Sequence, residues 1–181
     1  MRKNRCTSGI LGLAVLSLVI VGCHLVSGTF VIVESFSFTT QTGFYRYEVD
    51  ITDEEKWEDH KDDISRINVV GFELWITNNE SVDVTFNAYI DDADATFYST
   101  YAEVDANATK IIDDLTLAAG PGMVTHITYA QSFNYLRNVG ELKRLTKEGR
   151  FHCYCVSDGG TYSAFIVDSG KVIITFSAGG I

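Results

Sequence analysis

The chain has 181 residues, a length that suits one domain with a sizeable hydrophobic core. Its 24 acidic side chains outnumber its 14 lysines and arginines, which gives a formal net charge of −10. Such an acidic surface repels phosphate groups, so we expect no nucleic-acid partner and no role that depends on gripping anionic lipid head groups.

The N-terminal segment has the pattern of a secretory signal. Arg2, Lys3 and Arg5 come first with no acid among them, and residues 10–21 are all apolar, glycine or serine. A basic segment followed by a short apolar segment is typical of a signal peptide. We therefore expect 1–22 to be a signal peptide that is removed from the mature protein.

The apolar run ends at Gly22, a small residue directly before Cys23. This segment resembles the lipobox of bacterial lipoproteins, although Val21 is bulkier than the small residue usual at its position, and the resemblance stops at Cys23. It implies that the thiol of Cys23 takes a diacylglycerol, that cleavage follows Gly22, and that acyl chains then hold the exported protein on a membrane. Because His24 is not an aspartate, it also implies the outer membrane in a source with two membranes.

Two alternatives to lipidation stay open. Apolar residues resume over 29–33 and could extend the first run into an uncut membrane span of about 20 residues, although His24, Ser27 and Gly28 interrupt it. Ordinary cleaved secretion is the other alternative. In the lipidated form, residues 23–28 would make a very short tether, and the single domain over 29–181 would lie close to its membrane.

Most of the remaining sequence alternates apolar and polar residues, the pattern of half-buried strands separated by polar turns. Two segments have helical spacing instead. In 52–64, Thr52 and Glu55 suggest a capping box and Trp57 a core anchor, and 132–147 repeats apolar residues every three or four positions before Gly149. The expected strands are 29–38, 44–51, 67–77, 82–90, 96–104, 110–117, 123–129, 150–157, 162–168 and 171–176, the last two joined by a turn at Ser169 and Gly170.

Many short strands with polar turns predict a mainly β fold. We expect an antiparallel β-sandwich, Ig-like or jelly-roll-like, with two short helical insertions. The sequence has no internal repeat and no linker that would divide the domain.

Cys153 and Cys155 alternate with Tyr154 on an expected strand, so both thiols should face the same side while His152 faces the other. Residues two apart on one strand do not reach disulfide geometry without distortion. We favour a buried apolar pair of cysteines. A strained or intermolecular disulfide, that is, a redox pair, and a metal or nucleophile site that includes His152 remain alternatives.

The turn after the expected strand 82–90 carries Asp91, Asp92 and Asp94. Hard oxygen ligands at this spacing could wrap Ca²⁺ with help from backbone carbonyls. The turn lacks the glycine and the distal glutamate of an EF-hand loop. A plain solvated turn is the interpretation we prefer over a calcium site.

Aromatic residues follow that turn at Phe97, Tyr98 and Tyr101. Exposed aromatic rings on a sandwich face can stack on sugar rings, with a nearby acid bonding the hydroxyl groups. In strands, however, aromatic side chains mainly pack in the core or across to a neighbouring strand. Core packing is therefore the first interpretation and a glycan site the second.

The sequence contains no nucleophile elbow, glycine-rich phosphate loop, paired zinc-ligand spacing or nucleotide-binding signature. We therefore expect a non-enzymatic binding or structural domain of the cell envelope that docks another envelope protein or forms part of an assembly. A carbohydrate- or calcium-binding module is the first alternative. An envelope hydrolase is the second, because sequence order does not define a Ser-His-Asp arrangement.

Overall fold

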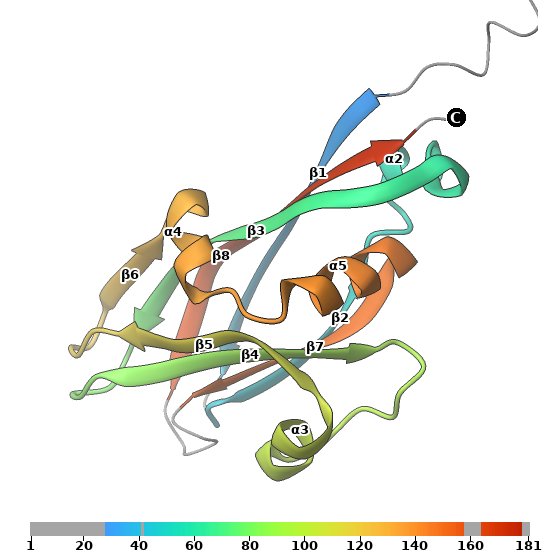
Figure 1. The fold of residues 1–181 in the computed structure, drawn as a ribbon. Coiled ribbons are helices and arrows are strands. Elements are labelled where there is room, and N and C mark those ends of the chain that lie inside the picture. The colour runs from blue at the N-terminus through green and yellow to red at the C-terminus, as the bar shows by residue number, and fades with distance from the viewer. Residues whose placement is uncertain (1–27, 41, 158–163, 179–181) are drawn as a thin grey trace, which may run out of the picture.

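The computed structural model describes residues 28–40, 42–157 and 164–178 (Figure 1). The expected signal peptide, Cys23 and the tether to residue 27 lie outside this part of the chain. Two four-stranded antiparallel sheets face each other, so the predicted β-sandwich is confirmed. Sheet A has the order β1 (Gly28–Thr40), β8 (Phe165–Ala178), β3 (Ile64–Asn78) and β6 (Met123–Ile127); sheet B has the order β2 (Phe44–Asp50), β7 (Arg150–Ser157), β4 (Val84–Asp92) and β5 (Thr109–Leu117).

The strand pairs are nested along the sequence. β4 pairs with β5, β3 with β6, β2 with β7, and β1 with β8, as if one long hairpin had been rolled into two layers. Eight strands in two sheets with this connectivity make a jelly roll, whereas an immunoglobulin constant domain places seven strands in a different order. Of the two kinds of sandwich expected from the sequence, the strand pairing therefore matches the jelly roll.

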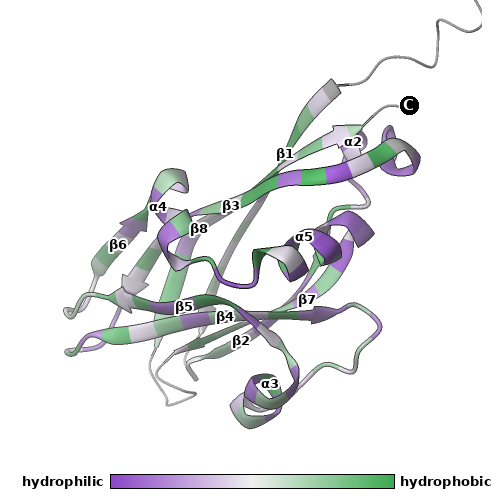
Figure 2. Cartoon of the chain, in the orientation of Figure 1, coloured by the Kyte–Doolittle hydropathy of each residue, from purple (hydrophilic) through white to green (hydrophobic). Residues whose placement is uncertain are grey.

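Alternation along the strands places the core between the sheets. In β1, Phe30, Ile32, Glu34, Phe36 and Phe38 point inward, whereas the residues that alternate with them are exposed, including Val33 at 46%. Figure 2 shows hydrophobic and hydrophilic segments following one another along the strands. One face of each strand is thus buried and the other solvated, which fixes the register of the pairs.

Helices close the sandwich at its sides. α5 (Val139–Glu148) contacts strands of both sheets and buries Leu142 and Leu145 (Figure 1). α3 (Tyr101–Asn107) places Val104 in a second hydrophobic cluster with Tyr89 and Tyr154 of sheet B, on the face away from the main core. None of the helices in the described ranges is long and apolar enough to cross a bilayer.

The expected helix over 52–64 is shorter than predicted. It consists of α2 (Glu55–Glu58) and a 3₁₀ turn, η2 (Lys61–Asp63). The capping box was wrong, because the Thr52 hydroxyl donates to Asp50 at 2.6 Å and Glu54 occupies the N-cap position without a side-chain bond. Trp57 is 4% exposed, so its prediction as a core anchor is confirmed.

The expected strand over 96–104 was also wrong. Residues from Tyr101 form α3, and Thr100 and Glu103 make a full capping box at its start. The strand expected to reach Tyr129 ends at Ile127, because Thr128 and Gln131 cap a further helix, α4 (Tyr129–Tyr135). Reciprocal side-chain caps therefore outweighed the β propensity of the aromatic and β-branched residues.

The amphipathic segment 132–147 forms parts of two helices rather than one. Leu136 is extended and forms an isolated β-bridge with Ile112, which interrupts the helix after α4. Asn138 then adopts a left-handed conformation with φ of 47° and donates to the carbonyl of Lys110 at 2.8 Å. Asparagine tolerates this conformation better than most residues.

Residues Ser169 and Gly170 do not form the predicted turn. They lie inside β8, which pairs with β1 and β3 along its length with one register shift against β1 and three against β3. Gly170 is opposite Phe36, whose ring occupies the space that a Cβ would need. A glycine within a strand here marks close approach rather than a chain reversal.

Candidate functional site

The core of the sandwich contains a cavity of about 80 Å³. Its lining comes from both sheets and from α5, and the lining residues are apolar except for Glu34, two tyrosines and two cysteines. A cavity this apolar stays dry, because a water molecule inside it would find too few hydrogen-bond partners. The lining residues are Glu34, Phe36, Phe38, Tyr45, Tyr47, Val49, Val70, Gly71, Phe72, Leu74, Phe86, Ala88, Ile111, Ile112, Leu136, Leu142, Phe151, Cys153, Cys155, Val167 and Val172.

The exposure of the lining residues locates the mouth of the cavity. Glu34, Phe36 and Phe38 on β1 and Tyr45 and Tyr47 on β2 are all half-buried, whereas the lining residues from β3, β4, β5 and α5 are buried. β1 and β2 are edge strands of the two sheets. The cavity therefore opens between these two edges.

One end of the mouth is closed by aromatic stacking. The rings of Phe38 and Tyr45 lie parallel, with centroids 3.8 Å apart and an interplanar angle of 3°. This pair joins the edge of sheet A to the edge of sheet B near the connection between β1 and β2. The open part of the mouth thus lies toward Glu34 and Tyr47.

Glu34 occupies an inward position of β1, between Ile32 and Phe36. Burial raises the pKa of its carboxyl, and the negative charge of Glu54 raises it further. No hydrogen bond to the Glu34 carboxylate is present among the described residues. The mouth therefore has a negative potential and an unused hydrogen-bond acceptor. The sequence signal was a charge on the inward face of an otherwise apolar row, which we did not single out.

Both thiols face the cavity, as predicted from their spacing. Cys153 is opposite Tyr47 and half-buried, Cys155 is opposite Tyr45 and buried, and both are free cysteines. A hydrogen bond with Cys153, followed by burial, raises the pKa of Cys155 well above its ordinary value. The thiolate is the reactive form of cysteine, so this arrangement does not activate Cys155 as a nucleophile.

His152 points away from the thiols, also as predicted. It is 3% exposed, and its ring stacks on that of Phe97 with centroids 3.7 Å apart. Its Nδ1 has no hydrogen-bond partner among the described residues. The histidine belongs to the outer face of sheet B and has no part in the cavity.

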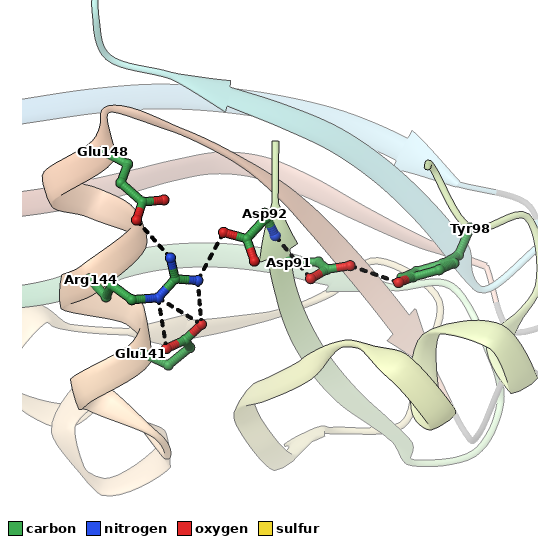
Figure 3. A network of polar contacts seen from close by, with 6 residues as sticks. All are labelled: Asp91, Asp92, Tyr98, Glu141, Arg144 and Glu148. Atoms are coloured by element: carbon green, nitrogen blue, oxygen red, sulfur yellow. Dashed lines mark hydrogen bonds and ion pairs between the residues drawn. The ribbon is translucent and has the colours of Figure 1, made fainter. Parts of the chain in front are cut away.

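The three aspartates proposed as calcium ligands diverge. Asp91 accepts a hydrogen bond from the Tyr98 hydroxyl at 2.7 Å, Asp92 accepts one from Arg144 at 2.9 Å, and Asp94 is exposed (Figure 3). The bond to Asp91 is the main reason that the pKa of Tyr98 rises to about 12. In the described ranges, no group of three or more His, Cys, Asp or Glu side chains is placed to hold a metal ion.

Arg144 gives this turn a structural role. Its guanidinium bonds Asp92 on β4 and two acids of its own helix, Glu141 at 2.6 Å and Glu148 at 2.6 Å (Figure 3). The network therefore ties α5 to the end of β4. The sequence signal for the two ion pairs within α5 was the spacing of its charges. Glu141 lies three residues before Arg144, and Glu148 lies four residues after it.

The aromatic residues proposed for sugar stacking lie at the edge of the second hydrophobic cluster. Phe97, Tyr98 and Tyr101 are half-buried and pack against a group that includes Tyr89 and Tyr154. Their rings thus take part in packing between sheet B and α3.

No family model matches the sequence, and no curated protein matches it. Similar solved structures include Desmodium yellow mottle tymovirus, with 12% identity, a TM-score of 0.32, and coverage of 85% of this chain and 90% of that one. Turnip yellow mosaic virus has 8% identity, a TM-score of 0.30, and coverage of 85% and 84%. Infectious bursal disease virus, Gx strain, has 13% identity, a TM-score of 0.33, and coverage of 84% and 37%. Values this low carry no argument about function.

Proposed function

We propose that the protein is a lipid-tethered, non-enzymatic binding domain of a bacterial cell envelope, which takes up a small apolar molecule between its two sheets. The cavity that opens between β1 and β2 carries this proposal. An apolar pocket with a few polar groups at its mouth is a usual place for a ligand.

Energetics favour an occupant. An empty cavity costs about 24 cal/mol per Å³, so this one costs about 2 kcal/mol of stability. That is a sizeable share of the stability of a single domain. An apolar ligand recovers part of that cost by restoring contacts to the lining.

The mouth selects among amphiphiles. Glu34 and Glu54 disfavour an anionic head group, and the unused carboxylate of Glu34 favours one that donates a hydrogen bond. The ligand we propose is therefore a short hydrocarbon chain with an uncharged or cationic head. A tether through Cys23 would hold the mouth near a membrane, which is a source of such molecules.

The cavity is tested with the full-length protein in lipid nanodiscs. Hexylamine and hexanol should raise the melting temperature of the wild type, and hexanoate should raise it less. Ala88→Leu fills the cavity from β4 and should abolish the shifts, whereas Ser35→Leu introduces a leucine on the exposed face of β1 and should preserve them. Equal shifts in both variants would mean that the probes act on the bilayer or the surface.

The anchor is tested by metabolic labelling with palmitate. Cys23→Ala should abolish labelling of the protein, and Cys153→Ala, which removes a thiol of the cavity, should leave labelling unchanged. Continued labelling of Cys23→Ala would contradict the lipid tether but would leave the cavity proposal in place.

A further inference from the structure

The outer face of sheet A contains a second candidate site, built around a β-bulge. Ser169 of β8 is paired with Trp75 of β3, but the next pair is Ile76 with Val167, so Asp168 is an extra residue in β8. The same extra residue shifts the register with β1. The bulge leaves Asp168 exposed beside Ser169, and bulges commonly re-aim side chains in this way next to functional sites.

Asp168 is fixed in this position. Its carboxylate accepts a hydrogen bond from the hydroxyl of Thr77 at 2.5 Å, and Thr77 is 8% exposed. The bond uses one carboxylate oxygen, and the exposed carboxylate keeps further acceptor capacity.

Trp75 is the aromatic centre of this face. The ring of His126 stacks on its indole, with centroids 4.3 Å apart and an interplanar angle of 10°. The ammonium of Lys171 lies 5.7 Å from the indole centroid. Glu73 pairs with both neighbours, at 3.2 Å from His126 and 3.9 Å from Lys171, and so holds them beside the ring.

These side chains surround a shallow depression of about 460 Å³, lined by Trp75, Val124, Asp168, Ser169 and Lys171. The depression offers part of the Trp75 indole, which also stacks on His126 and lies beneath the ammonium of Lys171. It further offers a carboxylate acceptor, an ammonium donor and a hydroxyl that can both donate and accept.

We propose that this depression binds a neutral saccharide, with a pyranose ring against the indole of Trp75 and hydroxyl groups bonded to Asp168, Ser169 and Lys171. A sugar has an apolar ring face and hydroxyl groups that both donate and accept, which matches this mixture of groups. A quaternary ammonium would suit the indole but is repelled by Lys171. An anion would suit Lys171 but is repelled by Asp168 and by the net charge of −10.

The site is tested with the full-length protein in nanodiscs. A glycan array of neutral oligosaccharides identifies a binder, which is then titrated by calorimetry. Asp168→Asn retains an acceptor for Thr77 but loses the charge, and it should weaken binding about tenfold or more, as should Lys171→Gln. Lys110→Gln is the matched control, because Lys110 lies 5.4 Å from the ring centroid of Tyr89 on sheet B and should not affect binding.

Trp75→Phe, which keeps a ring but reduces its face, should also weaken binding, and the melting temperature of each variant shows that it is folded. The proposal is overturned if no neutral glycan is retained, or if Asp168→Asn and Trp75→Phe bind it as tightly as the wild type does. Ala88→Leu should leave saccharide binding intact, so failure of the cavity proposal would not affect this one.

Discussion

The ring of Phe36 lies directly on Gly170, its partner across β1 and β8. A Cβ at Gly170 would overlap three atoms of that ring. Since Phe36 lines the mouth of the cavity, its position there depends on the absence of a side chain at Gly170.

We predict that Gly170→Ala destabilises the protein by about 1 to 3 kcal/mol, because the ring of Phe36 must move out of a packed position. Gly140→Ala is the control, since no atom lies within 4 Å of a Cβ there and alanine favours the helix by up to about 1 kcal/mol. Urea denaturation measures both. Unchanged stability of Gly170→Ala would show that the ring is not held in place.

Glu34 should lower stability as the pH rises. Its pKa in the folded protein is above the ordinary value of 4.5, so the folded state binds more protons than the unfolded state just above that pH. Glu34→Gln should therefore be more stable than the wild type at neutral pH, and the difference should shrink as the pH falls through the raised pKa and be lost below 4.5. Thermal denaturation over a pH series measures this, and a destabilised Glu34→Gln at neutral pH would contradict it.

Glu141 should raise the stability of the folded protein as the pH rises, which is the opposite of the effect of Glu34. Hydrogen bonds from Arg144 lower the pKa of its carboxyl, so its contribution is present above the ordinary value of 4.5 and is lost as the pH falls through the lowered pKa. Glu141→Gln should cost no more than about 1 kcal/mol at neutral pH, because the pair is exposed to solvent. The same pH series tests it, and added salt should reduce the difference.

The two cavity thiols should differ in reactivity. In the native protein N-ethylmaleimide should alkylate the half-buried Cys153 slowly and leave Cys155 unmodified, because Cys155 is buried and its pKa is raised. Peptide mapping by mass spectrometry separates these sites from Cys6 and Cys23. A cavity ligand should slow alkylation of Cys153, and urea should expose both thiols. Equal native rates would refute the burial of Cys155.

The periodicity of the sequence predicted most of the sandwich, because apolar and polar residues alternate along a half-buried strand and so show which face is buried. It failed where a local cap competed with propensity. Between Thr96 and Tyr101 the residues favour a strand, but Thr100 and Glu103 cap α3 in both directions. The threonine and the glutamate three residues after it are the sequence signal of this capping box.

Other features could not be predicted from any single segment of the sequence. Ser169 and Gly170 resemble a turn, and only the distant ring of Phe36 explains a glycine within β8. The cavity depends on how two sheets pack, which no single segment encodes, and the Trp75 depression depends on a bulge that places Asp168 beside a residue of another strand. Alternation along single strands made visible the inward position of Glu34 and the shared face of Cys153 and Cys155.

The nested pairing of the strands also constrains how the protein is made. Synthesis proceeds from the amino end, and all four strands of sheet B precede β8 in the chain. Sheet B can therefore form on a nascent polypeptide while sheet A still lacks the strand that separates β1 from β3. Until β8 arrives, β1 has no neighbour in its sheet and presents an unprotected edge of the kind that associates with other chains. β1, the strand next to the proposed anchor, therefore gains its sheet neighbour only after β8 has been synthesised.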